Sequence, residues 1–207
     1  CTICIPKRFR TEKGQHMSEM VKVVVDAMGG DNAPEEPVKA AVEAVKEKEN
    51  IQVILTGVQD VIEAELRKYP DYPKDRIRVV HASQVIETAE PPVMAIQKKK
   101  DSSIVVGLNL VKKQEADAFV SSGSTGAVLV GGQVIVGRIK GIRRPPLAPL
   151  IPTAKGVSLL IDCGANVDAR PDHLVQFAQM GSIYMENVVG IKKPRVAIVN
   201  NGAEEEK

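Results

Sequence analysis

Aromatic side chains are scarce in this chain of 207 residues: they make up 3% of it, and tryptophan is absent. Hydrophobic residues nevertheless make up 43% of the sequence, so valine, isoleucine and alanine must do most of the packing. Cores of this kind are typical of parallel sheets that are buried on both faces. The composition therefore favours an α/β fold with a sizeable core.

The net charge is small and cysteines are few. The formal net charge is +2, so nothing in the composition calls for a nucleic-acid partner. Three cysteines, Cys1, Cys4 and Cys163, are too few for a disulfide framework, which indicates a reducing cytoplasm. Cys1 and Cys4 form one C-x-x-C pair with no second pair, so we expect no metal site, and we expect no cofactor.

No apolar run reaches the length of about 18 residues that a membrane span needs. The first residues are basic but lack the apolar segment of a secretory signal. Residues 1–19 show no sustained periodicity, and Met17 and Met20 are both candidate first residues. We therefore expect a disordered N-terminal extension over residues 1–19 and an α/β domain over residues 20–207.

Strand and helix patterns alternate from Val21 onward. Strands are expected over residues 21–27, 51–56, 77–81, 118–121, 157–161 and 195–200. A first helix is expected from Pro34, with Val38, Ala41, Val42 and Val45 inward. Two more are expected after caps at Asp60 and Ser102, a fourth begins at about Ala127, and a fifth runs from a cap at Asp172 to about Asn187. Residues 87–92 and 143–152 are rich in proline and are expected to be irregular. This order predicts a three-layer α/β/α sandwich around a mainly parallel, Rossmann-like sheet.

Three of the expected strands end in loops of small residues. The loops are Asp26 to Asp31 with Gly29 and Gly30; Ser122, Gly123, Ser124, Thr125 and Gly126; and Asp162 to Asn166 with Gly164 and Ala165. Because the carboxyl ends of parallel strands share one edge of a sheet, we expect the three loops to converge. Free backbone N–H groups in such loops suit phosphate or another anion. The alternative is that each loop is only a tight turn between a strand and a helix.

Five segments carry a resemblance to a known family. They are residues 26–31 followed by Ala33 and Pro34, residues 136–142, residues 144–149, residues 162–168, and residues 173–178 with 180–182. With these motifs the chain resembles the PlsX family, the phosphate acyltransferases of bacterial phospholipid synthesis, from Val21 to Lys207. The resemblance implies a fold related to the phosphotransacetylases and isocitrate dehydrogenases.

The chain departs from the family pattern at three points. The second loop reads Ser-Ala-Gly-Asn-Thr-Gly-Ala in the family, whereas here Ser122 and Ser124 replace the alanine and the asparagine. A serine hydroxyl has a shorter reach than an asparagine amide, although a backbone cradle is unaffected. Cys163 lies where valine is common, which argues against a catalytic thiol. The family is longer, so we expect this chain to lack its C-terminal third.

PlsX-like enzymes convert acyl-acyl carrier protein and inorganic phosphate into acyl phosphate and free carrier, which implies acyl carrier protein and phosphate as partners. Phosphate is largely a dianion near neutral pH, so it needs positioning more than deprotonation. Backbone N–H groups of Gly29, Gly30 and the loop from Gly123 to Gly126 are the candidate ligands, with Ser122, Asp162, Gly164 and Ala165 beside them. The resemblance further implies a homodimer that associates with the inner face of the membrane and with a glycerol-3-phosphate acyltransferase.

Four side chains are candidates for the chemistry itself: Asp26, Asp31, Asn166 and Lys99. Asn166 or a loop N–H is expected to stabilise the oxyanion that forms at the thioester carbonyl. At least one of the three lysines at 98–100 is expected to contact phosphate or the acidic carrier protein. Alternatively, Asp31 caps a helix or pairs with a lysine. The alternative for Asp162 is that its carboxylate forms a turn.

Three other functions compete with this one. A phosphotransacetylase-like enzyme would use an acyl-coenzyme A thioester in place of the carrier protein. A nicotinamide dehydrogenase would need G-x-G-x-x-G after the first strand, which Gly29, Gly30 and Asp31 do not provide. A non-catalytic module would bind the carrier protein without turnover.

Overall fold

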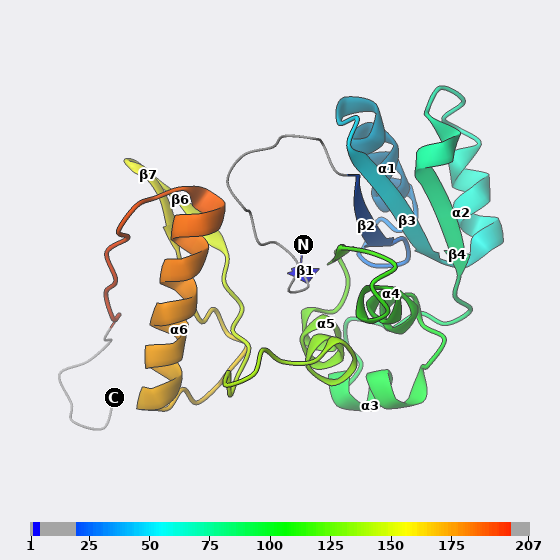
Figure 1. Ribbon diagram of the computed structural model, residues 1–207. Helices are drawn as coiled ribbons and strands as arrows, with labels where there is room; N and C mark the ends of the chain where they lie inside the picture. Colours follow the sequence, from blue (N-terminus) through cyan, green and yellow to red (C-terminus); the bar gives the residue numbers. More distant parts are fainter. Residues whose placement is uncertain (1, 5–19, 200–207) are drawn as a thin grey trace. The chain divides into compact units, whose positions relative to one another are not determined.

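The computed structural model describes residues 2–4 and 20–199 (Figure 1). The chain divides into two compact units, Cys1–Arg138 and Ile139–Lys207. Residues 2–4 form a strand, β1 (Thr2–Cys4), which the sequence did not lead us to expect, and the rest of the predicted extension lies outside the described residues. Within the described ranges, no helix is both long and apolar enough to cross a lipid bilayer.

The first unit is built on a five-stranded sheet. Four of its strands match the expected ones: β2 (Val21–Asp26), β3 (Ile51–Gly57), β4 (Ile77–His81) and β5 (Ala118–Ser121). These four are parallel, and β1 pairs antiparallel with β5 at the edge, which gives the order β1-β5-β2-β3-β4. The predicted mainly parallel sheet is therefore confirmed.

Two helices cover one face of this sheet, α1 (Glu35–Glu47) and α2 (Gln59–Leu66) (Figure 1). The buried stripe of α1 consists of the four predicted residues, Val38, Ala41, Val42 and Val45, spaced so that they lie on one side of a helix. They pack with Val53 and Leu55 of β3 and Ile62 of α2. The predicted cap at Asp60 is wrong: α2 begins at Gln59, so Asp60 lies in its first turn, where a carboxylate still faces the positive end of the helix.

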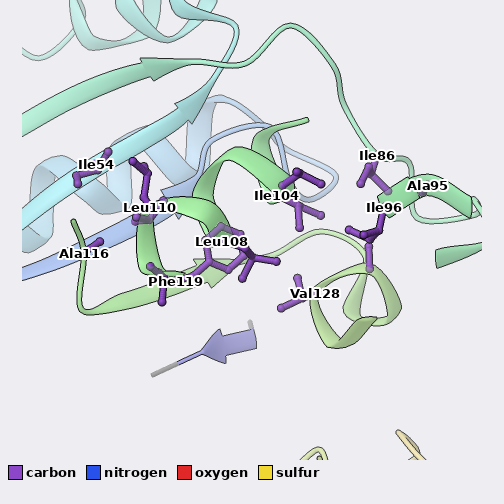
Figure 2. Close-up of a cluster of buried hydrophobic side chains, with 14 residues drawn as sticks. Ile54, Ile86, Ala95, Ile96, Ile104, Leu108, Leu110, Ala116, Phe119 and Val128 are labelled. Carbon is purple, nitrogen blue, oxygen red and sulfur yellow. The ribbon is translucent and has the colours of Figure 1, made fainter. Parts of the chain in front are cut away.

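Three helices lie on the other face: α3 (Pro92–Lys98), α4 (Ser103–Lys112) and α5 (Thr125–Gly131), which continues as a π-helical turn over Gly132–Val136. Ser102 caps α4 as predicted, since its hydroxyl accepts a hydrogen bond from the N–H of Val105 at 3.3 Å. Figure 2 shows the core on this side, in which Leu108 of α4, Phe119 of β5 and Val128 of α5 meet. Helix α3 was not predicted, because its prolines suggested a loop, yet a proline is well tolerated in a first helical turn.

The second unit holds an antiparallel pair of strands, β6 (Leu150–Thr153) and β7 (Gly156–Leu159), and helix α6 (Pro171–Tyr184) with a π-helical turn over Met185–Val189. The prediction that residues 157–161 join the parallel sheet is wrong, as is the expectation that residues 143–152 are wholly irregular. A tight turn pairs neighbouring strands directly, whereas parallel pairing needs a long crossover.

Two further expectations for the second unit are corrected. Residues 195–199, predicted as a last strand, form no strand in the structure. Asp172 does not cap α6, because the helix begins at Pro171 and Asp172 lies in its first turn, where it pairs with Arg143.

Candidate functional site

The strand order places the first two glycine loops side by side. From β2 the chain runs outward through α1, β3 and α2 to β4, and it then returns through α3 and α4 to β5 on the opposite side of β2. The order of the strands therefore reverses between β2 and β5. In open parallel sheets, ligands bind at the carboxyl edge where this reversal occurs. The loops that leave this point are those of Gly29 and Gly123.

The two loops are in direct contact. A β-carbon on Gly29 would stand 2.8 Å from the backbone nitrogen of Gly123, and one on Gly30 would stand 3.1 Å from Cβ of Ser122. Gly30 also has φ +101°, a conformation that side chains rarely adopt. Both positions need glycine for these reasons, and together the loops form one continuous surface made of backbone.

Several backbone N–H groups of this surface are available to a ligand. Within the described residues, no hydrogen bond uses the N–H of Gly30, Thr125 or Gly126, and the same holds for Gly29 and Ser124, which are buried. The hydroxyl of Ser124 caps α5, because it accepts from the N–H of Ala127 at 3.3 Å. Ser122 and Thr125 are exposed at the rim. A cluster of free N–H donors without a nearby cation can hold an anion.

The prediction that the N–H of Gly123 is a phosphate donor does not hold in this structure. This N–H donates to the hydroxyl of Ser121 at 3.0 Å, so it is not a free donor. The hydroxyl of Ser121 in turn donates to Oδ2 of Asp26 at 2.7 Å. Gly123 is therefore removed from the set of predicted phosphate donors, because its N–H stabilises the loop itself.

Asp26 lies beneath this surface and is 2% exposed. Its Oδ1 accepts from the N–H of Met28 at 3.1 Å. Burial raises the pKa of Asp26 above its ordinary value, while the hydroxyls of Ser103 and Ser121 and the N–H of Met28 act in the opposite direction. A carboxyl group that is this deeply buried does not contact a ligand on the surface of the loops.

The other sequence candidates of the first unit are Lys99 and Asp31. Lys99 donates to Oε1 of Glu90 and, at 2.6 Å, to the carbonyl oxygen of Val85, and this ammonium lowers the pKa of Glu90. Lys98 and Lys100 are exposed beside it. Asp31 is exposed and makes no ion pair within the described residues, and α1 has no side-chain cap, so neither alternative role of Asp31 is observed.

The third loop belongs to the second unit. Oδ1 of Asp162 accepts from the N–H of Leu147 at 2.6 Å, and Oδ2 accepts from the N–H of Asn166 at 2.7 Å. The side-chain amide of Asn166 donates to the carbonyl oxygen of Pro145 and to Asp162. Asp162 thus forms a turn, as its alternative role predicted. Gly164 is exposed and Ala165 is half-buried in the same turn. The strand before this loop is antiparallel, so the shared-edge argument for its convergence with the other two is wrong.

Sequence reasoning missed two residues that organise the site, Ser121 and Ser103. Val25 and Val120 are register partners, so Asp26 and Ser121 are the first polar residues after matching apolar positions. That pattern is visible in the sequence, but it identifies the pair only once β2 and β5 are known to be neighbours. No comparable signal points to Ser103.

Comparisons with known proteins identify the family of this chain. Residues 21–207 match the model of the family described as "Fatty acid synthesis protein". Proteins named "Phosphate acyltransferase" from Alkaliphilus oremlandii (strain OhILAs) and Clostridium novyi (strain NT) are 57% and 52% identical over 187 residues, which cover 90% of this chain. The chain belongs to the PlsX family of fatty acid synthesis proteins. It spans 55% and 56% of the length of these two relatives.

The PlsX assignment agrees with the fold. A crystal structure of a phosphotransacetylase from Streptococcus pyogenes matches with a TM-score of 0.62 and 19% identity, over 83% of this chain and 55% of that one. A likeness at this identity concerns the fold alone, and it confirms the predicted α/β class. Within the described residues, no three His, Cys, Asp or Glu side chains come together as the ligands of a metal would.

Proposed function

We propose that this chain carries the phosphate-binding part of an acyltransferase. The enzyme moves a long-chain fatty acyl group from acyl carrier protein to inorganic phosphate, and the acyl phosphate that results is used to make phosphatidic acid. The observation that carries the proposal is the contact between the Gly29 and Gly123 loops at the strand reversal, with unused N–H groups on both. Relatives named phosphate acyltransferase support the same chemistry.

In the proposed reaction the cradle binds and orients phosphate. The N–H groups of Gly30, Ser124, Thr125 and Gly126 donate to its oxygens, and one remaining oxygen attacks the thioester carbonyl carbon. A C–O bond forms, the carbonyl oxygen becomes an oxyanion, and collapse of this intermediate breaks the C–S bond and releases the carrier thiolate. Holding two reactants in line contributes up to about 7–11 kcal/mol to catalysis, so no covalent acyl-enzyme is required.

The oxyanion needs a donor, and a loop N–H suits this role in the structure better than Asn166. The Asn166 side chain already donates to Pro145 and Asp162, so it would have to leave these partners. Loss of one oxyanion donor typically costs about 3 kcal/mol in the barrier. Lys98 and Lys100 are the exposed cations for the acidic carrier, while Lys99 is held by Glu90.

Phosphate-dependent release of thiol from a long-chain acyl-acyl carrier protein tests the proposal. We would compare this chain with the longer Alkaliphilus oremlandii relative, and run acyl-coenzyme A in parallel. Turnover of the carrier substrate supports the proposal, whereas turnover of acyl-coenzyme A alone supports the phosphotransacetylase alternative. Carrier binding without turnover by either protein would contradict catalysis and leave a binding module.

Three properties of the proposed enzyme rest on the family resemblance: a homodimer, loose association with the inner face of the membrane, and a glycerol-3-phosphate acyltransferase as partner. Light scattering after size-exclusion chromatography measures the first, and cosedimentation with anionic vesicles measures the second. A monomer that stays in the supernatant would contradict both.

A further inference from the structure

We propose that Asp26 is a positioning residue that holds the two glycine loops at one fixed spacing and thereby sets the affinity of the cradle for phosphate. The second part of this proposal rests on the proposed function, whereas the first part stands on the geometry of the loops.

The carboxyl group of Asp26 joins both loops. One oxygen holds the first loop through the N–H of Met28, two residues further along the chain. The other oxygen holds the second loop through the hydroxyl of Ser121, which lies 95 residues away in the sequence and itself accepts from the N–H of Gly123. A single side chain therefore connects the two halves of the cradle, and no other hydrogen bond of the described residues links these two loops.

Asp26 acts from below and not by contact with the ligand. A β-carbon on Gly29 would stand only 2.5 Å from Oδ2 of Asp26, so the backbone of Gly29 covers the carboxyl group. With Asp26 2% exposed, an anion above the loops does not reach it. Its influence on phosphate is transmitted through the positions of Met28 and Gly123.

The groups around Asp26 are compatible with an anion bound above it. The groups that face it are the hydroxyl of Ser103 on α4, the hydroxyl of Ser121 on β5 and the N–H of Met28, and no charged side chain contributes to its pKa. Burial raises the pKa of Asp26, which is a shift toward the uncharged form that would not repel a bound phosphate. The neutral form still accepts from Met28 and still bonds to Ser121.

Three variants and one control test the proposal. Asp26→Ala removes both connections, Ser121→Ala removes the one to the second loop, and Asp26→Asn keeps both because its amide accepts from Met28 and donates to Ser121. Thr56→Val is the control: Thr56 is fully buried near the end of β3, and its hydroxyl donates to the carbonyl oxygen of Val25. Thr56 bonds to the first loop through its backbone carbonyl, which accepts from the N–H of Ala27 and which valine keeps. Calorimetric titration with inorganic phosphate measures the affinity. Hydrogen exchange of the amides of Met28 and Gly123 measures how firmly the two loops are held.

We expect Asp26→Ala and Ser121→Ala to bind phosphate about tenfold more weakly, and Asp26→Asn to stay within about twofold of the original chain. Thr56→Val should lower stability without changing the affinity. A purely structural role would lower the stability of all the variants and leave the affinity of the folded molecules unchanged, and that result would overturn the proposal. Should Asp26→Ala not fold, Ser121→Ala decides in its place.

The test also separates this proposal from the proposed function. If the original chain does not bind phosphate, the proposed function fails, and amide exchange then decides whether Asp26 positions the loops. Faster exchange of Met28 and Gly123 in Asp26→Ala, but not in Thr56→Val, supports positioning. Unchanged exchange at both amides overturns it.

Discussion

Gly107 of α4 lies against the ring of Phe119 of β5: a β-carbon on Gly107 would stand 2.5 Å from Cε2 of Phe119. This contact lets α4 pack closely on the sheet beneath the second glycine loop. Phe119 is fully buried, and it lies two residues before Ser121 on the same strand. The close packing of one helix thus supports the strand that carries half of the candidate site.

We expect Gly107→Ala to destabilise the protein by about 1–3 kcal/mol, because overpacking outweighs the gain in helix propensity. The smaller side chain in Phe119→Leu should make room, so that adding Gly107→Ala to that variant costs much less. Urea denaturation of the single and double variants measures the coupling. Additive effects of the two substitutions would contradict the contact.

Gly181→Ala is the matched control. Gly181 is also a buried glycine in a helix, α6, but there an added β-carbon would meet its nearest neighbours at an ordinary distance of 3.4 Å. We expect this substitution to stabilise the protein by up to about 1 kcal/mol, as expected for alanine in a helix. A destabilisation similar to that of Gly107→Ala would mean that the close contact with Phe119 is not the cause of the Gly107→Ala effect.

Gly29→Ala should separate the two loops. Its new methyl group would lie 2.5 Å from the carboxyl of Asp26 and 2.8 Å from the nitrogen of Gly123, so one of the loops has to move. We expect a loss of about 1–3 kcal/mol in stability and phosphate binding at least about tenfold weaker. Calorimetric titration at a temperature where the variant remains folded measures this, and unchanged affinity would contradict it.

The pKa of Asp26 predicts a pH dependence of stability. Because this pKa is raised above its ordinary value of 3.8, the folded chain keeps a proton that the unfolded chain loses in the window between the two values. The stabilisation is complete below the unfolded pKa and decreases as the pH rises through the folded pKa. Asp26→Asn removes this titration, so its stability relative to the original chain should increase with pH across the window and then level off. Parallel pH profiles would contradict the raised pKa.

Charge reversal tests the exposed lysines. We expect Lys98→Glu with Lys100→Glu to weaken binding of acyl carrier protein about tenfold at low salt, with a smaller effect at about 0.5 M salt, where exposed charges are screened. Lys112→Glu with Lys113→Glu makes the same change in charge at the exposed end of α4 and is the control. Equal losses in both double variants would point to net charge and not to a docking site.

Local patterns predicted much of the fold. The inward stripe of α1 and the cap at Ser102 follow from the spacing of a few residues, because helix faces and caps depend on neighbours within one or two turns. The same reasoning failed at α3, where two prolines suggested a loop, and at Asp60, where the helix starts two residues earlier than the cap requires. Element boundaries depend on the tertiary contacts that extend or shorten each helix.

The sequence by itself determined that buried strands end in glycine loops rich in backbone donors, and that these loops belong to a PlsX-like protein. Only the tertiary structure decided that β5 lies beside β2, that Ser121 meets Asp26 across 95 residues, and that the N–H of Gly123 is already in use. The physical reason is that small residues and alternating patterns act locally, whereas the choice of a strand's neighbour depends on which packing buries both faces of the sheet.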